Sequence, residues 1–291
     1  MPFSFQRDDR NSEKAVRGIA AERLDTSCLL LDDPALPRET LIHELRKNVK
    51  QTRALLRLVR PGFKGYAREN AALRDAARLI SDLRDADVLG ANLDRIGAKS
   101  DLAPDRIAAL RAHLAPTASL ASSPEERLDA HRAAISAVAA RIPRWKITGT
   151  DFDAFSDGLE QTWDTARSAM RKAFADPTGA ALHTWRKRVK DHWYHARLFA
   201  PIWPEMMQAH ITVADRLGET LGDARDLAVL IEALSDAGIA DREAAAALTR
   251  IAAEKERKLL RQGERLGRLL FSEPATGLSR RWRGWWEIWR G

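Results

Sequence analysis

The chain has 291 residues, which is enough for two domains or for one domain built twice. Hydrophobic residues make up 45% of the sequence, which is ordinary for a globular protein, and charged residues make up 31%, an excess that indicates helices with heavily charged outer faces. Lys and Arg outnumber Asp and Glu by 48 to 41, and a net charge of only +7 makes the placement of the cations more informative than their number.

Cys28 is the only cysteine, so the sequence excludes an intramolecular disulfide and suits a reducing compartment. No run of about 18 apolar residues occurs, which argues against a membrane-spanning helix. Residues 1–10 lack the apolar stretch of a signal peptide. These features predict a soluble, cytoplasmic protein.

Helical periodicity runs through nearly every long segment, and no segment has the alternating pattern of a strand. Prolines fall where helices should end, for example at Pro61, Pro143 and Pro201. The sequence therefore predicts an all-α fold. In chain order, the predicted helices cover residues 13–29, 37–60, 65–98, 103–115, 122–142, 153–175, 178–200, 204–236, 239–270 and 276–290.

Two of these helices carry the same motif, 140 residues apart. The first begins at His43 and reads HELRKNVK, and the second begins at His183 and reads HTWRKRVK. A second echo lies downstream, where Arg84-Asp85 of the first copy matches Arg225-Asp226 of the second. The repeat indicates one helical unit present twice, as two bundles around a pseudo-twofold axis. The predicted divisions are 1–148 and 149–272 for the two units, and 273–291 for a Trp- and Arg-rich C-terminal helix.

Each motif helix separates into two faces when its residues are placed about 100° apart. In the first, apolar residues such as Leu45 and Val49 share one arc. A histidine and five cations share a separate arc of about 120°, which contains no carboxylate. The first cationic stripe consists of His43, Arg46, Lys47, Lys50, Arg53 and Arg57. The second cationic stripe consists of His183, Arg186, Lys187, Lys190 and Arg197, with Trp193 at the position of Arg53 and Tyr194 inside the arc.

A solvated charged face is the usual explanation of such a run, but solvated faces mix charges of both signs. Like-charged neighbours three or four residues apart cost about 0.2–0.5 kcal/mol each, so a stripe without carboxylates opposes folding by roughly 1–2 kcal/mol. A bound polyanion would reverse the sign of that cost. The first stripe runs about 21 Å along its helix, which suits an extended, repeating phosphate chain better than a compact anion.

His43 and His183 open equivalent stripes. Neighbouring cations disfavour the imidazolium until an anion arrives, so we expect both histidines to donate hydrogen bonds to phosphate and to gain a proton on binding. The remaining histidines are interpreted as structural; these are His113, His131, His192, His195 and His210.

The paired H-x-x-R-K-x-x-K helices and R-D segments resemble the CHAD family, the conserved histidine α-helical domain, over roughly residues 13–270. The resemblance implies two antiparallel four-helix bundles, a basic central surface, and binding of inorganic polyphosphate without a cofactor. It places the binding role on the eleven residues of the two stripes. Family members are often fused to CYTH triphosphatase domains or associate with polyphosphate granules. Trp193, and Ala228 where the first copy has Asp87, set the two copies apart.

Two other functions remain as alternatives. The string Glu254-Lys255-Glu256-Arg257-Lys258 resembles the E-x-E-x-K signature of CYTH enzymes, but that signature requires a strand and this segment is helical. With no P-loop and no metal-ligand spacing, we expect no catalytic and no metal-binding residues, although the chain could be an accessory subunit of a polyphosphate- or triphosphate-metabolising enzyme. Binding to a nucleic-acid backbone is disfavoured because few aromatic residues accompany the cations.

Two further segments carry surface cations. Arg257, Lys258, Arg261, Arg265 and Arg268 share one helix face, as either an extension of the basic surface or a solvated face. The C-terminal helix carries Leu278, Trp282, Trp285, Trp286 and Trp289 on one face. That face is expected to dock on the protein's own core or, alternatively, on a partner, granule or membrane surface.

Overall fold

The computed structural model describes residues 3–9, 11–114 and 123–291, with the backbone alone for residues 82–88. Within these ranges the chain forms eleven α-helices and no strand, which confirms the all-α prediction. The helices are α1 (Ser12–Leu31), α2 (Arg38–Leu58), α3 (Tyr66–Leu79), α4 (Asp82–Gly97), α5 (Pro104–Leu114), α6 (Pro124–Ala139), α7 (Asp153–Ala175), α8 (Gly179–Leu198), α9 (Pro204–Leu234), α10 (Arg242–Leu270) and α11 (Ala275–Arg290). Short 3-10 helices follow α2, α6 and α8; they are η1 (Arg60–Gly62), η2 (Ile142–Arg144) and η3 (Ala200–Ile202). The predicted helix ends at residues 115 and 122 lie outside the described residues.

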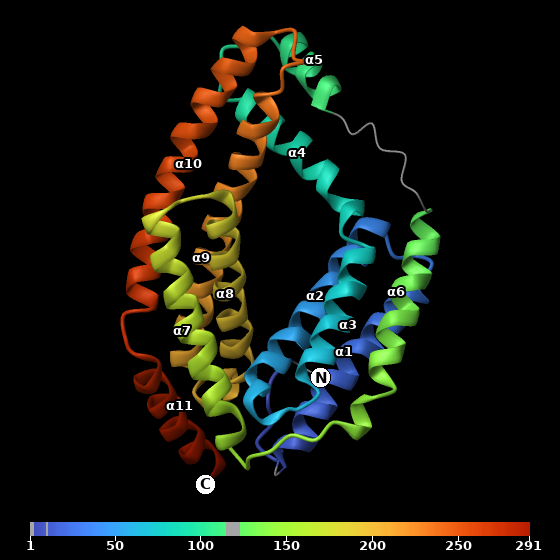
Figure 1. The fold of residues 1–291 in the computed structure, drawn as a ribbon, viewed down its shortest axis with the longest axis vertical. Helices are drawn as coiled ribbons and strands as arrows, with labels where there is room; N and C mark the ends of the chain where they lie inside the picture. Colours follow the sequence, from blue (N-terminus) through green and yellow to red (C-terminus); the bar gives the residue numbers. More distant parts are fainter. Residues whose placement is uncertain (1–2, 10, 115–122) are drawn as a thin grey trace.

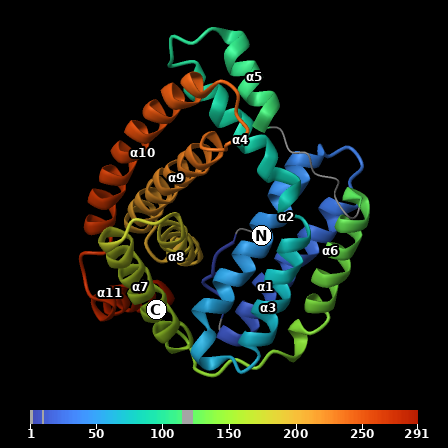
Figure 2. The same ribbon diagram turned by 45° about the horizontal axis from the view of Figure 1, so that its top comes forward.

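The helices form two sets that converge at their lower ends in Figure 1. In the first set, α1 and α3 each pack on both α2 and α6. In the second set, α8 lies between α7 and α9, and α10 runs along α9. Figure 2 shows α8 facing α2 where the two sets meet. Buried apolar side chains from both sets belong to one continuous core, so α2 and α8 are held in a fixed relation to each other.

α4 and α5 leave the first set and pack against the distant ends of α9 and α10 (Figure 2). A separate apolar cluster joins them, in which Leu93 of α4 is buried together with Leu227 of α9. The prediction of one helix over 65–98 is therefore wrong. The chain turns at Ile80 and Ser81, where the Ser81 hydroxyl donates a 2.9 Å hydrogen bond to a carbonyl of the preceding turn. The turn directs α4 away from α3 and across to the second set.

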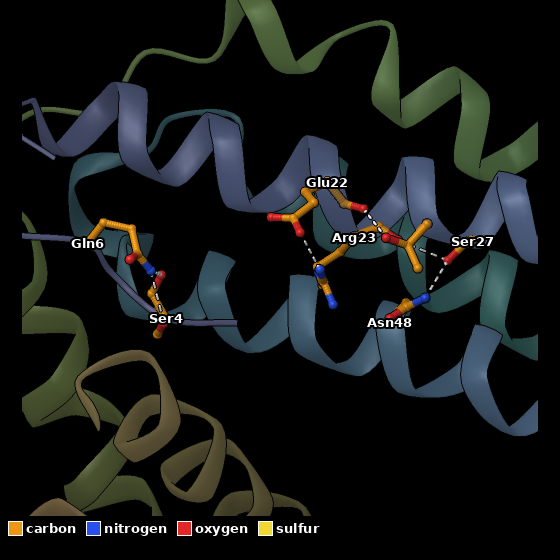
Figure 3. A network of polar contacts seen from close by, with 7 residues as sticks. Ser4, Gln6, Glu22, Arg23, Ser27 and Asn48 are labelled. Carbon is orange, nitrogen blue, oxygen red and sulfur yellow. Dashed lines mark hydrogen bonds and ion pairs between the residues drawn. The ribbon is translucent and has the colours of Figure 1, made fainter. Parts of the chain in front are cut away.

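Polar contacts fix the rotation of α2 against α1. The Asn48 amide donates to the Ser27 hydroxyl over 3.1 Å, and Ser27 donates to the Arg23 carbonyl over 3.1 Å (Figure 3). Asn48 belongs to the first motif but is buried, on the side of α2 that also carries Leu45 and Val49. A buried amide without a partner would cost about 1–3 kcal/mol, so this bond favours one rotation of α2. In that rotation the cationic stripe is left on the opposite side of the helix.

Two close contacts hold the two sets of helices together. The ring Nε2 of His195, on α8, lies 2.9 Å from the Ala54 carbonyl of α2. Gly158 of α7 lies directly against the end of α2, where a Cβ atom would come within 1.8 Å of the Leu58 carbonyl oxygen. Only glycine permits this approach of the two backbones. The C-terminal end of α2 is thus tied to both α7 and α8.

The C-terminal helix α11 docks on the protein's own core. Trp282 and Trp286 are fully buried against Phe199, and the Trp286 indole donates a 2.5 Å hydrogen bond to Asp151. The outer side of the helix carries Ile288, which is 80% exposed. Of the two expectations for this helix, the structure has the docked one. No helix in the described ranges is long and apolar enough to cross a bilayer.

Candidate anion-binding site

α2 presents the first cationic stripe on the face turned away from its buried apolar residues. Leu45 and Val49 are fully buried, whereas His43 and Lys50 are exposed and Arg46 is half-buried. The helix begins after Pro37, which cannot continue a helix from the residues before it. The predicted separation of faces is therefore present in the first half of the helix, whereas Arg53 and Arg57 toward its end are partly covered, the side chain of Arg57 being 13% exposed.

α8 has the same organisation. Thr178 caps its N-terminus by accepting a hydrogen bond from the Ala181 amide. Trp185 and Val189 are fully buried, while Lys187 is exposed and His183 is half-buried. The second stripe thus begins at the capped end of α8 and follows the helix toward its contact with α2.

The two stripes converge where α2 meets α8. Arg57 Nη1 of α2 lies 3.0 Å from one oxygen of Asp191, and Arg188 Nη1 of α8 lies 3.2 Å from the other. Burial lowers the pKa of Lys187, and among the cations that lower it further are Arg53 and Arg57 of the other stripe. Burial and the neighbouring Arg57 also lower the pKa of Arg53, to about 10. Cations separated by 130 or more positions in the sequence therefore act on one another in the fold, and we name the joined stripes the composite cationic surface.

α9 supports the second stripe from beside it. Arg186 Nε donates to the Gly218 carbonyl over 3.0 Å, and Lys190 Nζ lies 2.8 Å from Asp215 Oδ1. Arg225, also on α9, is close enough to lower the pKa of both His183 and Lys187. Arg225 belongs to the composite cationic surface, but the angular positions of residues around a single helix do not predict this. The sequence signals it only through the R-D echo, which indicates the duplication and the family resemblance but not a place beside the second stripe.

His183 is in a strongly cationic environment. Its pKa is lowered to about 4, first by burial and then by Lys187, Arg225 and Arg186. Its buried ring Nδ1 has no hydrogen-bond partner among the described residues. The ring is therefore neutral at neutral pH, as expected for a histidine surrounded by cations before an anion binds.

Trp193 packs between two cations of its own stripe. Lys190 Nζ lies 3.8 Å from the ring centroid, and Arg197 Cζ lies 4.8 Å from it. Cation–π contacts of this kind hold the two cations at a fixed spacing. Tyr194 was predicted to lie inside the cationic arc, but the structure buries it, and burial raises the pKa of its hydroxyl.

Carboxylates are closer to the stripes than the sequence indicated. Glu44 lies outside the arc, yet its Oε2 reaches Lys47 Nζ at 2.7 Å. Arg57 is paired with Asp191, and Arg53 donates to Asn70 over 3.0 Å. The predicted cost of like-charged neighbours on an isolated helix is therefore too large, because partners from the same helix and from other elements offset part of it.

The other histidines and charged segments singled out in the sequence lie away from this surface or in packing contacts. His131 bonds to the Ala76 carbonyl, His195 to Ala54, His192 is enclosed by aromatic rings, His210 contacts Arg281, and His113 pairs with Asp236. The E-x-E-x-K string lies on α10, not on a strand, and Glu254 there pairs with Lys258. The five cations of α10 are exposed, and Arg268 among them pairs with Glu264. The side chains of Arg84 and Asp85 lie outside the described residues. In the described ranges, no group of three His, Cys, Asp or Glu side chains could hold a metal ion.

Comparison with known families gives a match. The model of the CHAD domain matches residues 29–235, a segment that includes both cationic stripes and the α9 residues beside them. Searches of curated proteins and of solved structures gave no match.

Proposed function

This chain belongs to the CHAD domain family, and we propose that it binds inorganic polyphosphate along the composite cationic surface, without catalysing a reaction. The observation that carries the proposal is the convergence of two cationic stripes at the α2–α8 contact. Such a surface exceeds the dimensions of one phosphate and offers repeated contacts to a chain of them. Beyond the stripes themselves, we add Arg225 to the proposed contacts.

We further propose that the two motif helices belong to equivalent units, which are bundles related by a pseudo-twofold axis and divided near residue 148. The equivalent roles of α2 and α8 support this, since each presents its stripe to the same junction. Association with polyphosphate granules or with a polyphosphate-metabolising enzyme is part of the proposal and follows from the family resemblance.

A nucleic-acid backbone is the second candidate ligand, because phosphates in any chain attract the same cations. Single-stranded nucleic acid gains much of its affinity from bases stacked on exposed aromatic rings. Lys190 and Arg197 already occupy positions over Trp193, and Tyr194 is buried. These contacts favour polyphosphate over nucleic acid.

Isothermal titration calorimetry tests the proposal with long-chain polyphosphate at two salt concentrations, against single-stranded DNA and orthophosphate. We expect salt-dependent binding of polyphosphate that exceeds binding of DNA. Lys187→Gln should weaken it by about three- to tenfold, as expected for one charge-assisted contact. Lys14→Gln removes the same charge outside both stripes and should change affinity by less than about twofold. Equal or tighter binding of DNA would contradict the proposal.

A further inference from the structure

One carboxylate reaches the second stripe from a neighbouring helix and holds one of its cations. Lys190 Nζ of α8 lies 2.8 Å from Asp215 Oδ1 of α9, and the same ammonium lies 3.8 Å from the Trp193 ring centroid. Gly218, also on α9, leaves room for the stem of this lysine, because a Cβ there would come within 2.9 Å of Lys190 Cδ. The Asp215 carboxylate and the Trp193 ring therefore hold the ammonium of Lys190, and its stem lies against α9 where Gly218 has no side chain.

Asp215 differs from Asp191, the carboxylate at the α2–α8 contact. The side chain of Asp191 is only 10% exposed and is shared by Arg57 and Arg188, so it holds elements together. The side chains of Asp215 and Lys190 are 39% and 26% exposed, so solvent and ions reach this pair. An exposed pair is weak enough to exchange partners, whereas a buried pair is not.

We propose that Asp215 is an internal counter-ion of Lys190, which an incoming phosphate must displace before the second stripe is fully engaged. The inference rests on the proposed function and concerns the regulation of its site. A single anion that binds at Lys190 exchanges one partner for another and gains little. A chain that also contacts Arg186 and Lys187 brings its next phosphate to Lys190 at high effective concentration. Asp215 thus disfavours small anions and favours chains.

The direct test is Asp215→Asn in the full chain, titrated with long-chain polyphosphate. Removing the competing carboxylate should tighten binding by about three- to tenfold. Phosphate then no longer has to break the half-exposed Lys190–Asp215 pair, and no displaced carboxylate is left to repel it. The dependence of affinity on salt should steepen by about one released ion, because Lys190 then neutralises phosphate without giving up a partner. Asp215→Ser serves as a second variant if the first folds poorly.

Two comparisons decide the mechanism. Glu254→Gln makes the same change of net charge at another exposed carboxylate that pairs with a lysine, Lys258, and should change affinity by less than about twofold. In a Lys190→Gln background, Asp215→Asn should give a gain of less than about twofold, because only the general repulsion of phosphate by the carboxylate is then removed. An equal gain from Glu254→Gln, or an undiminished gain in the absence of Lys190, would overturn the inference. Wild-type protein that fails to bind polyphosphate would instead contradict the proposed function itself.

Discussion

At His183, burial and three nearby cations act in the same direction and lower the pKa to about 4. A bound phosphate opposes those cations and raises the pKa, so the complex takes up a proton that the free protein does not hold. Affinity should therefore increase as pH falls from about 8 to about 5. It should level off below the pKa that His183 has in the unbound protein. Calorimetry at several pH values measures this, with long chains whose internal phosphates stay ionised throughout.

The matched variants for this pH dependence are His183→Gln and His113→Gln. The first removes the titrating ring from the site, so its affinity should vary less with pH than that of the wild type. The second removes a histidine that pairs with Asp236 away from the surface, and should keep the wild-type dependence. An unchanged pH dependence in His183→Gln would show that another group takes up the proton.

Gly222 provides a second prediction at the scale of one residue. A Cβ there would come within 2.9 Å of Arg186 Nε, the end of a flexible side chain. Gly222→Ala should therefore displace Arg186 and weaken polyphosphate binding by about three- to tenfold. The fold should tolerate the change, because alanine favours a helix over glycine by up to about 1 kcal/mol. Gly18→Ala on α1, where a Cβ would have nothing within 4 Å, is the control that should leave binding unchanged.

Among the elements, the pair α2 and α8 depends on Asp191. This carboxylate bridges Arg57 of one helix and Arg188 of the other, and all three side chains are largely buried. Asp191→Asn leaves two guanidinium groups without their counter-charge, and should reduce the free energy of unfolding by about 2–4 kcal/mol. Urea denaturation measures this loss. Asp164→Asn, which removes an exposed partner of Arg167, should cost less than about 1 kcal/mol.

The helices also show how much of the fold could be predicted from the sequence. The limits of α2 and α8 and their two faces follow from periodicity and from the flanking prolines, which are local properties. The turn at Ile80–Ser81 has neither proline nor glycine, so the continuous helical pattern predicts a single helix over 65–98. The residues that lie beside the stripes could not be predicted. The carboxylate of Asp215 and the cation Arg225 both approach from another helix. The angular position of a residue on one helix does not reveal what a neighbouring helix brings beside it.

The stability of the whole molecule against acid depends on histidines in its core. Burial lowers the pKa of His195 to about 4, partly offset by its bond to Ala54, and lowers the pKa of His210 to about 4. The pKa values of His131 and His192 are also lowered, chiefly by burial. These rings are neutral in the native chain but become protonated in the unfolded chain below about pH 6.5. The unfolded state then binds more protons, so stability falls as pH falls from about 6.5 toward 4.

We expect this loss to be large compared with the total stability of a protein. His195 alone contributes up to about 3 kcal/mol across that range, and native proteins are stable by only about 5–15 kcal/mol. Urea denaturation at a series of pH values should therefore give a midpoint that falls steeply below about pH 6. Polyphosphate should act in the opposite direction, because its affinity for the folded state rises over the same range through His183, and a ligand that prefers the folded state stabilises it. Long-chain polyphosphate should thus shift acid unfolding to lower pH. A urea midpoint that is independent of pH between about 6.5 and 4 would contradict the neutral state assigned to these core histidines.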